Sequence, residues 1–299
     1  MNSKNNSTIK SKASPVSVIS LVVLILYTAV LLGLLLWGFM TSFKGAREFN
    51  KRPYQIPQKW VFNLGEVIKN FKLNKADASG VSRSVGIYQM LGYSVLYALG
   101  CSLAFTIVQS VTAYAAARFN FGFSKVIYAI VIITMIVPLV GTLPSEVELC
   151  VKLGLYNRIY GLWIMKANFL GMYFLIFYNL FKSLPASFTE AAKIDGASNF
   201  TIMTRIIYPL SMNTIGTVLL INFITFWNDY QTPLLYMPGY PTVSYGLYAI
   251  TFAGSNVGSV NNVPCRIAAA MLVVLPILVL FFIFQKRLLG NLTVGGVKG

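Results

Sequence analysis

The chain carries the stretch SFTEAAKIDGASNFTIMTRIIYP at residues 187–209. Ser187 and Glu190 have the spacing of a capping box, in which two side chains satisfy free backbone N–H groups at the start of a helix. Ala191 and Ala192 leave one side of that helix without bulky side chains. Asp195-Gly196 supplies the backbone freedom for a sharp turn. The stretch therefore predicts a compact knob of helix, turn and helix directly before a long apolar run.

The rest of the chain has the composition of a protein that lies in lipid. Of its 299 residues, 56% are hydrophobic and 11% are charged, whereas about a quarter of the residues are charged in ordinary soluble domains. No linker rich in proline, glycine or serine divides the chain, so we expect one membrane domain.

Six apolar runs approach the roughly 20 helical residues that a bilayer core of about 30 Å requires. They are Val16–Met40, Met90–Ala117, Val126–Leu143, Gly161–Phe181, Pro209–Tyr230 and Ile267–Phe284. We therefore predict an all-α membrane protein with six transmembrane helices. Its parts are a tail at 1–15, a six-span domain at 16–284 that contains a knob loop at 187–208, and a second tail at 285–299.

The distribution of positive charge predicts the orientation of these spans, because lysine and arginine in short loops mark the cytoplasmic side. Both termini and the knob loop fall on the side that carries Lys4, Lys10, Lys12, Arg118, Lys125, Lys182, Lys193, Arg205, Lys286, Arg287 and Lys298. We therefore expect both termini and the knob to be cytoplasmic.

The first loop on the opposite side conflicts with this pattern. It holds nine cations: Lys44, Arg47, Lys51, Arg52, Lys59, Lys69, Lys72, Lys75 and Arg83. Charge in a loop of over roughly forty residues weighs less in setting topology, so we give it little weight. Its part from Trp60 to Lys75 could form a helix on the membrane surface.

Several functions are disfavoured by what the sequence lacks. The chain contains no histidine, which removes imidazole general bases, Ser-His-Asp triads and histidine metal ligands. It has no GxxxxGK[ST] phosphate loop, so any ATP has to be hydrolysed by a partner. The three cysteines have no paired spacing, which indicates neither a disulfide framework nor a metal site. The net charge of +16 is spread between apolar runs, which argues against a nucleic-acid partner.

On physical grounds alone, the knob is either a connector or a docking element for another protein. Its pattern, however, resembles the EAA motif of ATP-binding-cassette importer permeases: Glu-Ala-Ala, three residues, glycine, nine residues, isoleucine, one residue and Leu-Pro. The matching positions are Glu190, Ala191, Ala192, Gly196, Ile206 and Pro209, and the departure is Tyr208 where the family usually has leucine. Two further stretches, 226–229 (FWND) and 292–299 (LTVGGVKG), resemble carbohydrate-uptake permeases of the maltose type.

The resemblance implies a type I importer permease fold in a bacterial cytoplasmic membrane. It implies that Glu190, Ala191, Ala192, Asp195 and Gly196 belong to a coupling helix that sits in a cleft of an ATPase. The implied partners are a second homologous permease, two ATPase subunits that bind ATP and Mg²⁺, and an extracytoplasmic sugar-binding protein. This chain would hold no cofactor and would move a sugar or oligosaccharide.

The fifth predicted span has a polar stripe. At about 100° per residue, most of its polar side chains fall within an arc of roughly 140°, which should face protein or a watery path because polar groups are costly in lipid. From this stripe we predict Asn222, Thr225, Asn228 and Asp229 as substrate-path residues. Packing between helices is the competing interpretation, and Asp229 would also suit a solvated position at the outer interface.

Two other classes remain as alternatives. A secondary transporter or channel would be expected to carry a carboxylate or ring of charge within its spans, and none of the eight acidic residues lies near a predicted span centre. A membrane enzyme would need a nucleophile arrangement that the sequence does not offer.

Overall fold

The computed structural model describes residues 14–76, 82–119, 122–137, 141–252 and 262–292. Most of the predicted tail at 1–15, the end of the predicted tail at 285–299 and most of the 292–299 motif therefore lie outside the described residues. The helices are α1 (Pro15–Thr41), α2 (Ala46–Lys51), α3 (Asn63–Asn70), α4 (Ile87–Arg118), α5 (Phe123–Ile136), α6 (Leu143–Lys152), α7 (Ile159–Lys166), α8 (Met172–Ser183), α9 (Ser187–Ile194), α10 (Asn199–Ile202), the π-helix η1 (Met203–Ile207), α11 (Tyr208–Asn228), α12 (Gln231–Tyr236), α13 (Val243–Phe252) and α14 (Val263–Leu292). Strands β1 (Lys72–Ala76) and β2 (Ser82–Gly86) pair antiparallel.

Four helical segments of the described chain are long and apolar enough to cross a membrane: Pro15–Thr41, Ile87–Arg118, Asn199–Asn228 and Val263–Gln285. They correspond to the first, second, fifth and sixth predicted spans. The third predicted span corresponds to α5, which has 14 residues and ends at Ile136.

The fourth predicted span, Gly161–Phe181, is wrong as a continuous helix. The chain instead forms α7 and α8, and Gly171 between them has a φ of +116°. Polar groups satisfy the interrupted backbone, as buried non-helical segments require. Nε2 of Gln109 on α4 donates to the carbonyl of Leu170 at 2.7 Å, and Oδ1 of Asn168 accepts from the N–H of Leu170 at 3.1 Å.

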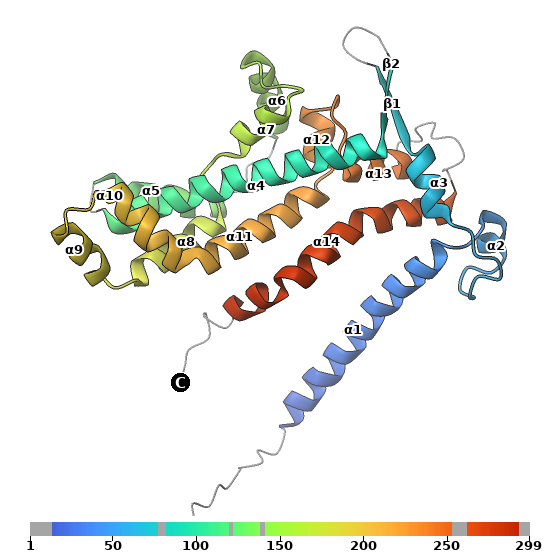
Figure 1. Ribbon diagram of the computed structural model, residues 1–299, viewed down its shortest axis with the longest axis horizontal. Coiled ribbons are helices and arrows are strands. Elements are labelled where there is room, and N and C mark those ends of the chain that lie inside the picture. Colours follow the sequence, from blue (N-terminus) through green and yellow to red (C-terminus); the bar gives the residue numbers. More distant parts are fainter. Residues whose placement is uncertain (1–13, 77–81, 120–121, 138–140, 253–261, 293–299) are drawn as a thin grey trace, which may run out of the picture.

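Helix α4 is the centre of the bundle and packs against α11, α8 and α7 (Figure 1). Helix α14 lies beside α11 and also contacts α1, α3 and α13. Two hydrophobic cores result. One gathers α7, α12, α13 and the N-terminal part of α14 around Tyr97 and Cys101 of α4. The other gathers α5, α8 and the knob around Ala113 and Tyr114 of the same helix.

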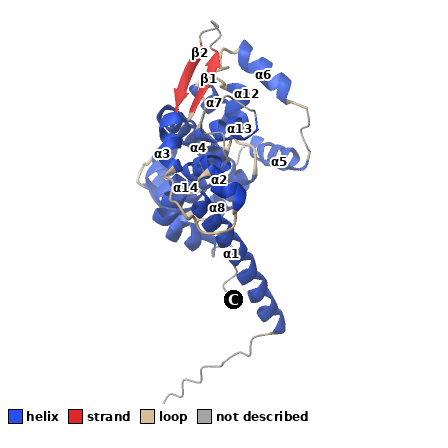
Figure 2. Cartoon of the chain, turned by 90° about the vertical axis from the view of Figure 1, so that its right-hand side faces the viewer, coloured by secondary structure: helices blue, strands red, loops and turns tan. Residues whose placement is uncertain are grey.

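Opposite ends of the molecule carry different elements. Figure 1 shows α9 and α10 at one end and α2, α3 and the β1–β2 hairpin at the other. Figure 2 views the hairpin end and shows α1 extending away from the remaining helices. None of the most apolar window of α1 is buried, so this helix presents its apolar side chains outward.

The surface helix that the sequence suggested within Trp60–Lys75 is shorter and differently placed. It spans Asn63–Asn70 and packs against α14. Val67 is fully buried in the first core, with Leu64 and Ile68 packed against it. Its apolar face therefore belongs to the protein interior and does not lie on lipid.

Candidate functional site

The knob, defined as residues 187–207, contains the turn that the sequence predicts. Gly196 has a φ of +78°, a left-handed conformation that side chains with a Cβ disfavour. Its N–H donates to the carbonyl of Lys193 at 3.0 Å, and the N–H of Ala197 donates to the carbonyl of Ala192 at 2.9 Å. This pair of bonds is the Schellman motif, which closes helix α9 and satisfies carbonyls that the helix end leaves free.

The predicted capping box is wrong. Helix α9 begins at Ser187 itself, so Ala186 occupies the N-cap and no side chain caps this helix. Backbone bonds from the N–H groups of Thr189 and Glu190 to the carbonyl of Ala186 close the first turn. A side-chain cap exists one helix later, where Oγ of Ser198 accepts from the N–H of Thr201 at 3.2 Å.

The knob continues without interruption into the fifth span. Helix α10, η1 and α11 form one helical run over Asn199–Asn228. Pro209 lies in the first turn of α11, directly after the wider π-helical turn of η1. A π turn is a known way to place a proline in a helical rod, because proline lacks the N–H of the regular pattern. The second half of the knob and α11 are therefore parts of one continuous helical segment.

The inner face of the knob is anchored in the second core. Ile202 and Ile207 are fully buried, and Ala192 is nearly so. They pack with Phe174, Phe177 and Phe181 of α8 and with Tyr114 of α4. Nη2 of Arg118 at the end of α4 donates to the carbonyl of Leu184 at 2.9 Å, which ties the chain entering the knob to the bundle.

Tyr208, the departure from the EAA pattern, has a defined place. Its hydroxyl lies 2.9 Å from Oγ of Ser110 on α4, and its ring stacks on Phe181 with centroids 6.2 Å apart. Leucine could supply apolar contact but not the hydrogen bond. In this chain the motif thus adds a polar link between the start of α11 and α4.

The outer face of the knob is apolar and uncovered. Ile194 is 86% exposed, Phe200 is 70% exposed and Phe188 is 44% exposed. Glu190, Ala191, Asp195 and Gly196 are exposed as well. The knob thus exposes three large apolar side chains, and exposed apolar surface that forms a contiguous patch is typical of interaction sites. The residue pattern identified the knob, but which way Ile194 and Phe200 point required the structure.

We expect Gly196→Ala to loosen the end of α9. A Cβ at this position meets no atom within 4 Å, so the effect isolates the left-handed backbone, which costs about 1–2 kcal/mol for a residue with a Cβ. Hydrogen exchange at the amide of Ala197 should accelerate by about fivefold or more. Gly196→Asn is the matched control, because asparagine tolerates this conformation, and its exchange should stay closer to that of the unchanged protein. Equal exchange in Gly196→Ala and the parent would contradict the assignment.

The four predicted path residues occupy different environments. Asn222 is buried, and its Nδ2 donates to Oγ1 of Thr106 on α4 at 3.0 Å. Thr225 and Asn228 are exposed, with Oγ1 of Thr225 donating to the carbonyl of Ile221 and Nδ2 of Asn228 to that of Ile224. The structure thus does not bring the four side chains together.

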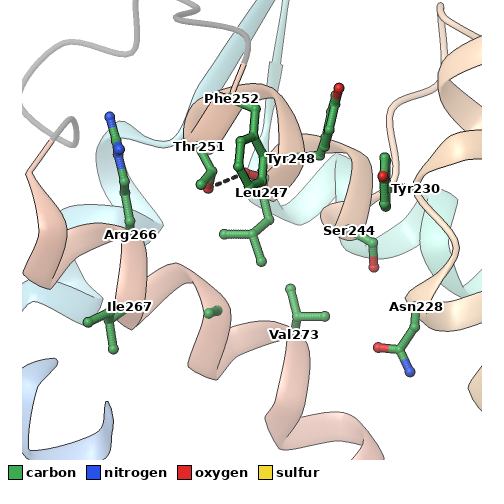
Figure 3. A pocket seen from close by; sticks show the side chains of 11 residues that line it. Asn228, Tyr230, Ser244, Leu247, Tyr248, Thr251, Phe252, Arg266, Ile267 and Val273 are labelled. Atoms are coloured by element: carbon green, nitrogen blue, oxygen red, sulfur yellow. Dashed lines mark hydrogen bonds between the residues drawn. The ribbon is translucent and has the colours of Figure 1, made fainter.

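Asn228 lines a cavity of about 440 Å³ at the C-terminal end of α11 (Figure 3). Helices α13 and α14 supply the other walls, with Ser244, Tyr248 and Thr251 on α13 and Arg266, Ile267 and Val273 on α14. Tyr230 and Tyr248 stack with ring centroids 4.4 Å apart. The lining is aromatic and apolar with a few polar groups, as small-molecule sites commonly are.

Asp229 is a structural link and not a freely solvated acid. It is partly buried and accepts from the hydroxyl of Tyr97 on α4 at 2.8 Å. Its second oxygen accepts from the N–H of Thr232 at 3.0 Å, in the first turn of α12. The sequence offers no signal for the Tyr97 contact, since the two residues are 132 positions apart.

Removing the Tyr97 hydroxyl should therefore destabilise the end of the bundle that is remote from the knob. Tyr97→Phe leaves a partly buried carboxylate without one of its donors, at a cost of about 1–3 kcal/mol. Thermal unfolding in detergent should show a lower midpoint, and the loss should shrink in the Asp229→Asn background. Tyr93→Phe, which keeps its edge-to-face contact with Tyr240, is the control. Additive losses for Tyr97→Phe and Asp229→Asn would contradict a direct link.

A second carboxylate connects helices α6 and α12. The hydroxyl of Tyr236 on α12 donates to Oε2 of Glu146 on α6 at 2.9 Å. Burial, and then the bond to Glu146, raise the pKa of Tyr236 to about 12. Hydrogen bonds from Thr142 and then Tyr236 lower the pKa of Glu146. The bond thus favours ionised Glu146, and its stabilisation is lost as the pH falls through the lowered pKa of that group.

Taken together, four helical segments able to cross a membrane and an exposed knob continuous with one of them describe a helical membrane protein. The chain belongs to the family of binding-protein-dependent transport system inner membrane components, whose model matches residues 109–291. The predicted resemblance is confirmed. The chain is a permease component of an ATP-binding-cassette importer, and its family is one of transport components, not of enzymes.

Similar proteins agree with this assignment. The melibiose/raffinose/stachyose import permease protein MelC of Bacillus subtilis is 28% identical over 81% of this chain and 84% of its own length. The diacetylchitobiose uptake system permease protein NgcG of Streptomyces coelicolor is 27% identical over 93% of this chain and 87% of its own length. A bacterial ABC transporter involved in alginate import contains a chain of the same fold, with a TM-score of 0.73 and 21% identity over 90% of this chain and 95% of that one.

Proposed function

We propose that this chain imports a sugar or oligosaccharide across a bacterial cytoplasmic membrane together with a second homologous permease, two ATPase subunits and an extracytoplasmic sugar-binding protein. The knob carries this proposal: apolar side chains face outward on a base that is packed into the bundle and continuous with α11. The sugar assignment is supported by the named substrates of relatives such as MelC and NgcG.

In this proposal the ATPase binds ATP and Mg²⁺, and this chain holds no cofactor and performs no catalysis. The ATPase cleft receives α9, with Glu190, Ala191, Ala192, Asp195 and Gly196 at the contact. Ala192 faces inward, so it would act by letting α9 lie close to the core. Closure of the two ATPase subunits would then move the knob and, through it, α11.

Purification of the tagged full-length chain from its native membrane tests this assembly. We expect an ATPase and a second permease in stoichiometric amounts, and ATP-dependent sugar uptake when the complex is reconstituted with its binding protein. Uptake that proceeds without any ATPase would support a secondary transporter or channel instead.

We further propose six membrane crossings with both termini and the knob in the cytoplasm, in the division 1–15, 16–284 and 285–299. Single cysteines at Gln58 and Asn199 report on opposite ends of the bundle, and both positions are exposed. The native cysteines Cys101, Cys150 and Cys265 are buried. A membrane-impermeant thiol reagent applied to intact cells should label Gln58→Cys and leave Asn199→Cys unlabelled; the reverse pattern would invert the topology.

For the substrate path we propose Thr225 and Asn228, whose side chains are exposed, with Asp229 at the outer end. Asn222 lies between α4 and α11 and would reach the path only when these helices separate.

The two roles of Asn222 can be told apart through its partner. If it acts in helix packing, Asn222→Leu and Thr106→Val should slow transport equally and the double variant should add little, because both remove one hydrogen bond worth about 0.5–1.5 kcal/mol. If it meets the sugar, Asn222→Leu should slow uptake well beyond Thr106→Val. Uptake rates normalised to the amount of assembled importer provide the measurement.

A further inference from the structure

The loop between α1 and α3 is held in a defined shape by a buried lysine. Lys44 is fully buried, and its Nζ donates to the carbonyls of Pro53 at 2.7 Å and Arg52 at 3.2 Å. Nδ2 of Asn63 donates to the carbonyls of Ser42 and Lys44 at 2.9 and 2.7 Å. These bonds fix the positions of the side chains that the loop presents, including those of α2.

Aromatic contacts place this loop at the level where α1 ends. Trp37 in the last turns of α1 lies 6.3 Å from the ring of Tyr54, and Phe43 lies 5.5 Å from the ring of Trp60. Tyr54 is 82% exposed and Trp60 is 67% exposed. Tryptophan and tyrosine gather where the membrane core meets the headgroups. Helix α1 is long and apolar enough to cross a membrane, and a bilayer around it would place this loop at the interface, at the end remote from the knob.

The same loop concentrates positive charge around a cavity. The cavity measures about 450 Å³ and is lined by Arg47, Glu48, Lys51, Arg52, Gln58 and Lys59. The carboxylate of Glu48 already accepts from the N–H of Gln58. The salt bridge found among the described residues is elsewhere, between Lys152 and Glu148. Four cations thus share one hollow with a single acid, an arrangement that favours an anionic ligand.

We propose that this cavity binds the phosphate of an anionic phospholipid headgroup in the leaflet that surrounds the end of α1. Arginine and lysine are the side chains that pair with phosphate, by two-point hydrogen bonding and as point charges respectively. Cation clusters next to a membrane span attract anionic lipids. The flanking Tyr54 and Trp60 favour a lipid over a soluble anion or an acidic protein surface, because they place the cations beside the headgroups. The excess charge of this loop is then a lipid site and not a topology signal.

Native mass spectrometry of the full-length chain in a neutral detergent tests the site, with phosphatidylglycerol and phosphatidylcholine as probes. We expect one tightly bound phosphatidylglycerol and no comparable phosphatidylcholine. The double variant Lys51→Gln/Lys59→Gln should weaken that binding by about 20-fold or more, because each cation near a membrane contributes roughly fivefold to the affinity for anionic lipid. The matched control is Lys69→Gln with Lys72→Gln, which removes the same charge from exposed positions of α3 and β1 outside the cavity and should leave binding unchanged.

Charge-conserving substitution keeps the test independent of folding: Lys51→Arg with Lys59→Arg should retain phosphatidylglycerol. Equal weakening by the cavity and control pairs would reduce the effect to net charge and overturn the proposal. Equal binding of both lipids would also overturn it. Displacement of the lipid by an equal concentration of glycerol phosphate would assign the cavity to a soluble anion. If the Lys51→Gln/Lys59→Gln variant kept its lipid but no longer bound the sugar-binding protein, the cavity would be a protein contact instead.

Discussion

Replacing Ile194 by aspartate is expected to abolish transport while leaving the chain folded in the membrane. Ile194 is 86% exposed at the end of α9, so its loss removes no internal packing. In the proposed assembly it enters the ATPase cleft, where truncation of a central apolar contact typically costs about 2–4 kcal/mol. ATPase affinity should therefore fall by roughly 30-fold or more, and sugar uptake should fall below a tenth of its normal rate. Pull-down of the ATPase and uptake in reconstituted vesicles supply the two measurements.

Asn199→Asp is the matched control for this variant. It adds the same charge at an exposed position of the knob without removing an apolar side chain, and it should assemble and transport nearly normally. Should Ile194→Asp retain full ATPase binding, the outer face of α9 would not be the docking surface.

Phe181→Ala is expected to give the largest loss of stability. Phe181 is fully buried and contacts the rings of Phe177, Tyr208 and Tyr114 from three helices. Removing such a side chain leaves a cavity and costs about 3–5 kcal/mol. Thermal unfolding of the purified chain in detergent should shift to a clearly lower temperature, and Phe181→Leu should lose much less because it preserves most of the volume.

Phe188 provides the contrast, since it has the same chemistry seven positions later and lies on the outer face of the knob with 44% exposure. Phe188→Ala should leave the unfolding temperature almost unchanged and weaken ATPase binding. Comparable thermal losses for the two phenylalanines would mean that the inner and outer faces of the knob are not distinct.

The parts of the fold that could be predicted were those with a strong one-dimensional signal. Continuous apolar runs identified α1, α4, α11 and α14, because lipid demands about 20 apolar residues in helix. The fourth run predicts one span because of its overall apolar character, although Lys166, Asn168 and Gly171 lie at the place where the helix breaks. That break depends on Gln109, a residue of another helix, which satisfies the open backbone.

In the candidate site, too, the features that depend on local sequence were easier to predict than those that depend on distant residues. The turn at Gly196 followed from local chemistry, because the left-handed conformation there needs glycine. The predicted cap at Ser187 failed because α9 starts one residue earlier than the capping pattern requires, with Ala186 in the cap position. The burial of Asn222 is decided by Thr106, 116 positions away, and no periodicity within α11 reveals which part of a polar stripe meets a neighbouring helix.

The interruption between α7 and α8 separates two helices that pack in different hydrophobic cores. Leu162 of α7 belongs to the first core, around Tyr97 and Cys101, whereas Phe174 and Phe177 of α8 belong to the second core, which packs against the knob. Helices α4 and α11 pass through both cores as unbroken rods. In the proposed importer, a rotation of the knob would be transmitted through these two helices, and the non-helical chain around Gly171 would absorb the change in angle without unwinding a helix. In such an importer, this arrangement would allow one end of the bundle to open while the other stays closed, as alternating access to the two sides of a membrane requires.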